Sequence, residues 1–152
     1  MALGFAARLG PFRRIGPSDL GRAEAALAAV GLPDHAGHPI GALSAGQFQR
    51  VLFARLMVHD APVLLLDEPF TAVDAATEED LIALVQAWHA GGRTIVAVLH
   101  DLDLVRAVFP RTLLLAGHPI AWGPTEAVLS ESNCIRAGLL RVRKPRAHLT
   151  AA

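Results

Sequence analysis

Apolar residues recur every three or four positions over residues 19–30, which predicts an amphipathic helix with Ser18 as its N-cap. Glycine and proline then end the helix, and further glycines and prolines over residues 34–42 predict a loop. A second helix is expected from about Ser44 to about Val58. This part of the chain is therefore expected to hold two helices joined by a loop.

Two short apolar runs have the length of strands. Val63–Leu66 ends in Asp67, and Arg93–Leu99 ends at His100. The first run is apolar throughout, the pattern of a strand that is buried on both faces. Between the two runs, a helix over Ala75–Ala90 is expected, capped by the aspartate that precedes it.

The remaining elements are shorter. Asp101 is expected to cap a helix that ends near residue 109, followed by a hairpin over residues 112–122 and a helical turn over residues 125–129. Residues 141–152 are rich in arginine and are expected to form a disordered tail. The alternation of strand and helix predicts an α/β fold with a largely parallel sheet, in which ligands bind beyond the carboxyl ends of strands.

Composition narrows the class of protein. Of the 152 residues, 53% are hydrophobic and 18% are charged, as in an ordinary globular protein. A formal net charge of zero gives no overall basic field that would favour nucleic acid. The single cysteine, Cys134, can form no disulfide within the chain, which favours a reducing cytosol. No apolar stretch approaches the roughly 20 residues that span a bilayer.

Two adjacent carboxylates, Asp67 and Glu68, follow the first predicted strand. One carboxylate at such a strand end can hold Mg²⁺, which prefers oxygen ligands, while the other polarises a water for attack on a phosphoryl group. The alternative is that both acids only cap the turn that follows.

Two further features are weaker when taken alone. Ser44, Ala45 and Gly46 open a helix, and a helix start with free N–H groups is a natural site for phosphate. The alternative there is an ordinary serine N-cap. His100, at the end of the second strand, could donate a hydrogen bond to a terminal phosphate, although a lone histidine is more often structural.

Together these motifs resemble the nucleotide-binding subunit of ABC transporters, over roughly 90 residues from Ile40 to about Leu129. Four motifs occur in the family's order: the signature, the Walker B strand, the D-loop and the switch histidine. They correspond to Leu43–Gln47, Val63–Glu68, Thr71–Asp74 and His100.

The resemblance implies a role for each motif residue. Asp67 would hold Mg²⁺, Glu68 would act as the catalytic base, His100 would clamp the terminal phosphate of ATP, and Asp74 would couple two sites across a dimer.

The signature residues would contact ATP held by the opposite protomer; they are Ser44, Ala45, Gly46 and Gln47. Ala45 replaces the commoner glycine at its place. Since alanine can hold helical backbone angles and still present its N–H, we expect reduced tolerance at this position and not loss of function.

Other motifs of the family are missing. A phosphate-cradling loop needs Gly-x-x-x-x-Gly-Lys-Ser/Thr, and the only lysine, Lys144, follows Arg143 and precedes Pro145. No glutamine precedes Gln47, so the Q-loop glutamine is absent as well. We therefore expect that this chain is the second half of a family member and that it hydrolyses no ATP on its own.

The expected parts follow from this assignment. Residues 1–42 would be part of the helical subdomain, 43–140 the C-terminal part of a P-loop NTPase-like, three-layer ATPase core with an incomplete sheet, and 141–152 the tail. Without the strand that carries the phosphate loop, neighbouring strands would have unpaired edges, and self-association or poor solubility is expected.

Within the family, the chain is similar to ATPases of zinc, manganese and chelated-iron importers, and uptake of zinc is the first expectation, with manganese next. The resemblance implies ATP and Mg²⁺ as cofactors, a second ATPase protomer in a homodimer, a transmembrane permease as partner, and a cytoplasmic position at the inner face of the membrane. No direct binding of the transported metal is expected. The pair His35 and His38 lies in a glycine-rich loop without a nearby cysteine, which disfavours a metal site.

Three alternatives stay open. The chain could be a non-catalytic fragment that completes a partner's ATP site in trans. It could be an α/β serine hydrolase that uses Ser44, Asp67 or Asp74, and His100, but this needs a strand directly before the serine. ABC-type ATPases that act on DNA usually carry coiled-coil or zinc-bearing insertions, and no such heptads or cysteine pairs occur in this chain.

Overall fold

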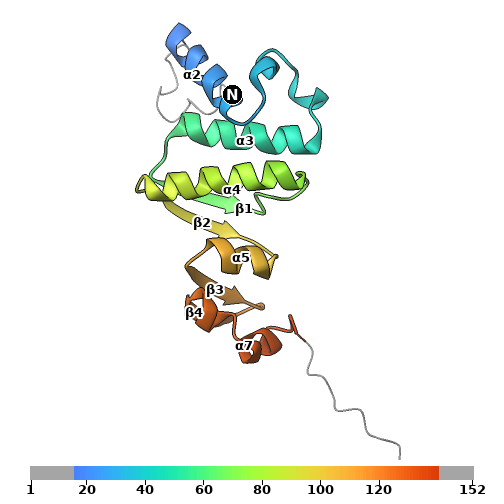
Figure 1. Cartoon of the computed structure of the whole chain (residues 1–152), viewed down its shortest axis with the longest axis vertical. Coiled ribbons are helices and arrows are strands. Elements are labelled where there is room, and N and C mark those ends of the chain that lie inside the picture. The colour runs from blue at the N-terminus through green and yellow to red at the C-terminus, as the bar shows by residue number, and fades with distance from the viewer. Residues whose placement is uncertain (1–15, 141–152) are drawn as a thin grey trace, which may run out of the picture. The chain divides into compact units, whose positions relative to one another are not determined.

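The computed structural model describes residues 16–140 of the chain (Figure 1). The first 15 residues and the predicted disordered tail over 141–152 lie outside this range. The chain divides into two compact units, residues 1–100 and residues 101–152, and each is described by itself. No helix in the described range is long and apolar enough to cross a membrane.

The first unit begins with helix α2, Pro17–Ala29, whose N-cap is Gly16 and not Ser18 as predicted. The start lies earlier because proline favours the first helical position, and because the backbone N–H of Gly16 donates to the carboxylate of Asp19 at 3.0 Å.

The segment between the first two helices is not extended. It holds two short 3₁₀ turns, η2 over Pro33–His35 and η3 over Ile40–Ala42. Helix α3 follows over Ala45–His59, with Ser44 as its N-cap, as predicted.

A parallel pair of strands forms the sheet of this unit. Strand β1, Val63–Asp67, pairs in parallel with β2, Thr94–Val98, and Asp67 lies opposite Val98 in the register. The connection between them is helix α4, Ala75–Ala90. A strand, a helix and a second parallel strand are the unit of an α/β fold, so the predicted fold class is confirmed.

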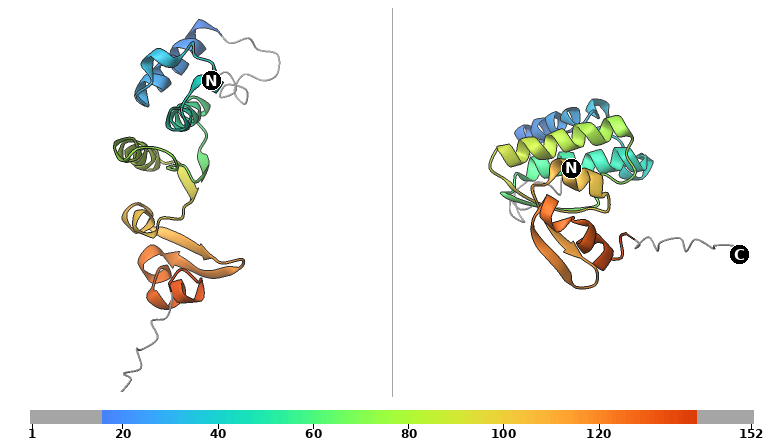
Figure 2. Two further views of the ribbon diagram at one scale, coloured as in Figure 1. Left: turned by 90° about the vertical axis from the view of Figure 1, so that its right-hand side faces the viewer. Right: turned by 60° about the horizontal axis from the view of Figure 1, so that its bottom comes forward.

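The core of this unit lies on the side of the sheet that α4 covers (Figure 2). Leu64 from the strand and Leu81 and Val85 from the helix are each only 2% exposed. The ring of Phe53, from α3, stacks on that of Trp88, from α4, with their centroids 5.9 Å apart. These contacts fix α3, α4 and β1 against one another.

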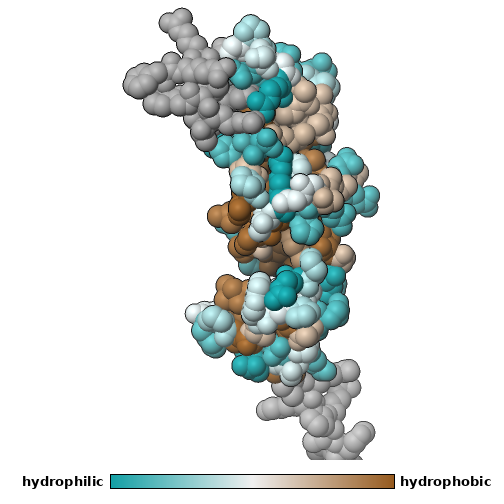
Figure 3. Space-filling view, turned by 90° about the vertical axis from the view of Figure 1, so that its left-hand side faces the viewer, coloured by the Kyte–Doolittle hydropathy of each residue, from teal (hydrophilic) through white to brown (hydrophobic). Residues whose placement is uncertain are grey.

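The other face of the sheet is bare within the described residues. Val63, Leu65, Val96 and Val98 are each at least half exposed, with Leu65 at 75%. Figure 3 shows hydrophobic residues gathered on the surface at the level of these strands. The prediction of a strand buried on both faces was therefore wrong for the described chain, because no described element of this unit covers this face. An apolar face of this kind is usually covered in a folded protein.

The second unit opens with helix α5, Leu102–Val108, and Asp101 caps it as predicted. The antiparallel hairpin consists of β3, Arg111–Leu115, and β4, Pro119–Pro124. Two short helices complete the unit: α6 over Thr125–Val128 and α7 over Glu131–Arg136.

Candidate functional site

Glu68 and His100 meet at the carboxyl end of the parallel sheet. The imidazole Nε2 of His100 lies 2.8 Å from Oε1 of Glu68. The backbone N–H of Glu68 donates to the carbonyl of Val98 at 3.0 Å, which extends the sheet pairing by one residue. Because both residues follow neighbouring parallel strands, the fold itself brings them together.

The backbone of Glu68 adopts a left-handed conformation, with φ of 45°. Such a conformation is unfavourable for a residue other than glycine and is concentrated at functional sites. The hydroxyl of Thr71 donates to the second carboxylate oxygen of Glu68 at 3.3 Å. Both members of the Glu68–His100 pair keep much of their side chains exposed, so a ligand can reach them.

Asp67 is the last residue of β1, and it is exposed. It lines a groove of about 560 Å³ between β1 and α3, together with Gln49 and Arg55. An exposed carboxylate at a strand end offers the hard oxygen donors that Mg²⁺ prefers, so this residue fits the metal. The metal would supply charge neutralisation for the phosphate oxygens.

The start of α3 is held by a reciprocal pair of hydrogen bonds. The hydroxyl of Ser44 accepts from the backbone N–H of Gln47 at 3.2 Å, and the side-chain oxygen of Gln47 accepts from the backbone N–H of Ser44 at 2.9 Å. This is a capping box, and it leaves the positive end of the helix dipole without a compensating carboxylate in its first turn. Ser44 and Ala45 are exposed, so an anion can approach this helix start.

Gly46 lies in the first turn of α3, directly against the backbone that follows β1. A Cβ placed on Gly46 would lie 3.2 Å from the carbonyl oxygen of Ala72, tighter than an ordinary contact. Ala72 itself has a left-handed φ of 64°. The close approach explains why a residue without a side chain stands at position 46.

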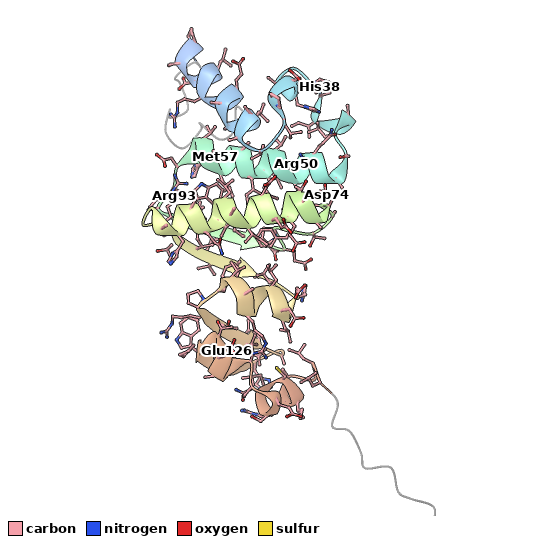
Figure 4. The ribbon with its side chains drawn as sticks, viewed as in Figure 1. His38, Arg50, Met57, Asp74, Arg93 and Glu126 are labelled. Carbon is pink, nitrogen blue, oxygen red and sulfur yellow. The ribbon has the colours of Figure 1, made fainter. Side chains whose placement is uncertain are left out.

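Two side chains of α3 also contact the segment that follows β1. The amide of Gln49 donates to the carbonyl of Pro69 at 2.6 Å. The guanidinium of Arg50 lies 3.7 Å from a carboxylate oxygen of Asp74, and both residues are labelled in Figure 4. No function was assigned to Gln49 or Arg50 from the sequence, although they lie two and three positions after the end of the predicted signature.

Asp74 caps α4, as predicted. Its carboxylate accepts from the backbone N–H of Thr77 at 2.9 Å and from the hydroxyl of Thr77 at 2.8 Å. These bonds to Thr77 lower the pKa of Asp74 below its usual value, and Arg50 adds a smaller effect in the same direction. Asp74 is therefore ionised at neutral pH.

The structure thus brings some predicted residues together and not others. Glu68 and His100 are paired, and the start of α3 contacts the backbone near Ala72. No hydrogen bond or ion pair among the described residues joins Ser44 to Glu68 or to His100.

The arrangement does not match a serine hydrolase. The residues just before Ser44 form the 3₁₀ turn η3 and not a strand, and the hydroxyl of Ser44 is used as a helix cap. His100 pairs with Glu68, which that alternative leaves without a role.

One contact at this site had no signal in the sequence. The side-chain nitrogen of Gln47 lies 3.2 Å from Nε2 of His35, a residue of η2 twelve positions earlier. The ring of His35 stacks on that of His38, with centroids 4.8 Å apart, and His38 is labelled in Figure 4.

Comparison with known families and proteins gives consistent results. The model of the ABC transporter family matches residues 9–71. The chain is 41% identical over 126 residues to the manganese transport system ATP-binding protein MntB of Bacillus subtilis, which covers 83% of this chain and 50% of that protein. It is 40% identical over 129 residues to the zinc transport system ATP-binding protein TroB of Treponema pallidum, with 85% and 48% covered. The chain spans about half the length of these curated relatives.

Solved structures agree with this fold. A transporter described as metal-chelate-type, in an inward-facing conformation, matches with a TM-score of 0.81 and 28% identity, over 91% of this chain and 55% of that one. The dimeric ATP-binding cassette MJ0796, bound to ADP and Pi, matches with a TM-score of 0.65 and 29% identity, over 74% of this chain and 50% of that one. The parallel pair β1–β2 thus belongs to the P-loop NTPase fold of ABC ATPase domains.

Proposed function

The chain belongs to the ABC transporter family, and on that premise we propose that it supplies the signature and the catalytic carboxylate of an ATPase that powers metal-ion uptake. The observation that carries this proposal is the pairing of Glu68 with His100 at the end of the parallel sheet. Manganese and zinc are the proposed ions, because the curated relatives named above belong to manganese and zinc transport systems.

The proposed chemistry divides between neighbouring residues. Asp67 would hold Mg²⁺, which neutralises charge on the phosphate oxygens of ATP. Glu68 would accept a proton from the attacking water, and it lies directly after the strand with its backbone in the left-handed conformation. His100 would orient Glu68 through their 2.8 Å contact before ATP binds and would donate its ring N–H to the terminal phosphate when ATP is present, because a neutral imidazole has one N–H.

The start of α3 would contact a nucleotide held by a second protomer. Ser44, Ala45, Gly46 and Gln47 present a helix N-terminus without an acidic residue in its first turn, which suits the terminal phosphate of ATP. Asp74 would transmit the state of one ATP site to the other, since its segment packs on this helix start. A homodimer and a transmembrane permease complete the proposed assembly.

The exposed apolar face of the β1–β2 sheet fits an ATPase whose sheet is covered by a further part of the protein. We propose that the half of the relatives that this chain does not match covers Val63, Leu65 and Val96. The phosphate-cradling loop would come from that half as well, because no such loop is present in this sequence.

A second candidate function uses the same signature without catalysis by this chain. The capping box of Ser44 and Gln47 is complete in the described residues, so it could serve ATP held by an intact partner in trans. Adding the chain to an intact relative, and measuring whether the ATP turnover of that relative rises, tests this candidate.

The main proposal can be tested with a chimera that joins this chain to the half of the Bacillus subtilis relative outside the match. The chimera is expected to restore manganese uptake to Bacillus subtilis cells that lack the relative, whereas the chain alone is not. A folded chimera that reaches the membrane and restores no uptake would contradict the energising role. Because the host permease selects the ion in this assay, the cargo needs a separate test: deletion of the gene in its own organism, followed by measurement of cellular manganese and zinc.

A further inference from the structure

The loop between α2 and α3 contains a histidine pair that the proposed catalytic scheme does not use. His35 is half-buried in η2, and His38 is exposed. Their rings stack, and no group of three or more metal-ligating side chains occurs among the described residues. The contact of His35 with Gln47 therefore calls for another explanation than metal binding.

The hydrogen bonds of Gln47 fix which end of its amide faces His35. A backbone N–H can only donate, and that of Ser44 lies 2.9 Å from Oε1 of Gln47, which must therefore be the acceptor. The opposite end of the amide is the NH₂ group, and it lies 3.2 Å from Nε2 of His35. Since NH₂ is a donor without acceptor capacity, Nε2 of His35 must accept.

The hydrogen bond that Nε2 of His35 accepts determines the protonation state of the imidazole. A histidine whose Nε2 accepts is neutral and carries its proton on Nδ1. If Nε2 were protonated, two donors would face each other at this contact, and turning the Gln47 amide would place its NH₂ group against the N–H of Ser44 instead. The neutral ring is thus the state that agrees with both hydrogen bonds of Gln47, and it places a proton on the buried Nδ1, which has no hydrogen-bond partner among the described residues.

His35 is itself held in place. Its backbone N–H donates to the carbonyl of Leu32 at 3.2 Å, and its carbonyl accepts from the N–H of His38 at 3.1 Å. Leu32 is only 2% exposed, so η2 is anchored in the core next to α2. A side chain on an anchored turn can restrain the residue that it contacts.

We infer that His35 is a positioning residue of the signature, which holds the amide of Gln47 so that the capping box stays closed at the phosphate-binding start of α3. The inference rests on the proposed function for its consequence in catalysis, but not for the contact itself. His35 touches no reacting atom in this scheme and acts only through Gln47. The chemical role is that of a neutral hydrogen-bond acceptor.

The contact can be tested in the chain itself by residue-resolved hydrogen exchange and NMR of the imidazole nitrogens. Replacing His35→Ala is expected to accelerate exchange of the Ser44 amide about two- to tenfold, the effect of losing one ordinary hydrogen bond. His35→Gln carries a carbonyl oxygen at a comparable reach and is expected to recover at least half of the protection. The nitrogen shifts of the wild type are expected to show a neutral ring protonated at Nδ1.

His38→Ala is the matched control, because it removes the stacked neighbour without touching Gln47. It is expected to change exchange of the Ser44 amide less than twofold. Equal acceleration in His35→Ala and His38→Ala would overturn the inference, since loop packing would then explain the protection. A ring protonated at Nε2 would overturn it as well.

The consequence for catalysis is measured in the chimera defined above. His35→Ala is expected to lower kcat/KM for ATP about two- to tenfold, with recovery by His35→Gln. If the chimera with His35 intact hydrolyses no ATP, the proposed function fails, while the exchange experiment still decides the contact. If the chimera is active and His35→Ala changes neither exchange nor kcat/KM, only the positioning role fails.

Discussion

The start of α3 and the segment after β1 lie against each other and carry opposite electrostatics. The signature, residues 43–47, contains no charged side chain and ends in a helix N-terminus with a neutral serine cap. The segment over residues 67–74 carries Asp67, Glu68 and Asp74. One region favours an anion directly, whereas the other tolerates an anion only with a cation present.

This difference in charge explains how one chain could hold both proposed sites. A triphosphate approaching residues 67–74 needs Mg²⁺ and a donor such as His100 to offset the carboxylates. A phosphate approaching α3 needs neither, because backbone N–H groups and the helix dipole face it. The two regions therefore suit different roles toward nucleotide, even though Gly46 and Ala72 nearly touch.

The largest effect is expected at Glu68, the proposed catalytic base of the acidic region. Glu68→Gln keeps the shape of the side chain and removes its capacity to accept a proton, so ATP turnover of the chimera is expected to fall about 100-fold or more. Steady-state phosphate release measures this. Glu79→Gln, at an exposed position of α4, is the control and is expected to leave turnover unchanged. Equal loss in both variants would remove the special role of the strand end.

The neutrality of the signature can be broken with a single charge. Ser44→Asp keeps a good N-cap but places a carboxylate where the phosphate would lie, so KM for ATP in the chimera is expected to rise about tenfold or more. Ser44→Asn, an equally good cap without charge, is the control and should raise KM much less. A similar KM for the two variants would show that no anion binds there.

Both regions belong to the unit whose sheet, β1–β2, has the bare apolar face described above. Leu65 and Val96 are cross-strand partners on that face, and replacing both by lysine is expected to reduce self-association of the chain alone, as measured by sedimentation. Leu20→Lys, at an exposed position of α2, is the control and should have little effect. In the chimera, the double variant should instead lower stability, because the face is then covered. A wild-type chain that melts cooperatively as a monomer would contradict this prediction.

The smallest effect concerns the charge of Asp74. Its pKa is lowered in the folded chain, chiefly by the backbone and hydroxyl of Thr77, so the stability that it contributes is fully present above its unfolded pKa of about 3.8. That contribution is lost as the pH falls through the lower, folded value. Asp74→Asn keeps the cap but is expected to flatten the acid limb of urea-unfolding curves measured below pH 5. An unchanged acid limb would show that Thr77 does not stabilise the charge.

Local chemistry made much of the fold and site predictable. Ser44, Asp74 and Asp101 cap the helices that follow them, because short polar side chains before an apolar repeat carry a strong local signal. The meeting of Glu68 and His100 could be expected as well, since both follow apolar runs of strand length. The motif roles of these residues stay predictions.

Other features depend on what surrounds a residue. The alternating burial of β1 could not be predicted from Val63–Leu66, because the sequence pattern describes a strand with both faces covered. The N-cap of α2 is Gly16 and not the predicted Ser18, because Pro17 and Asp19 together favour the earlier position. The contact between His35 and Gln47 arises from the packing of η2 near α3, for which no local pattern exists.

The most direct test of the whole account is the rate of ATP hydrolysis by three samples at matched concentration. These are the chain alone, the unmatched half of the Bacillus subtilis relative alone, and the chimera that joins them. Magnesium-dependent turnover is expected only in the chimera, since the phosphate-cradling loop and the catalytic carboxylate occur together only there. Turnover by the chain alone that Glu68→Gln abolishes would contradict the account, because nucleotide would then bind without that loop.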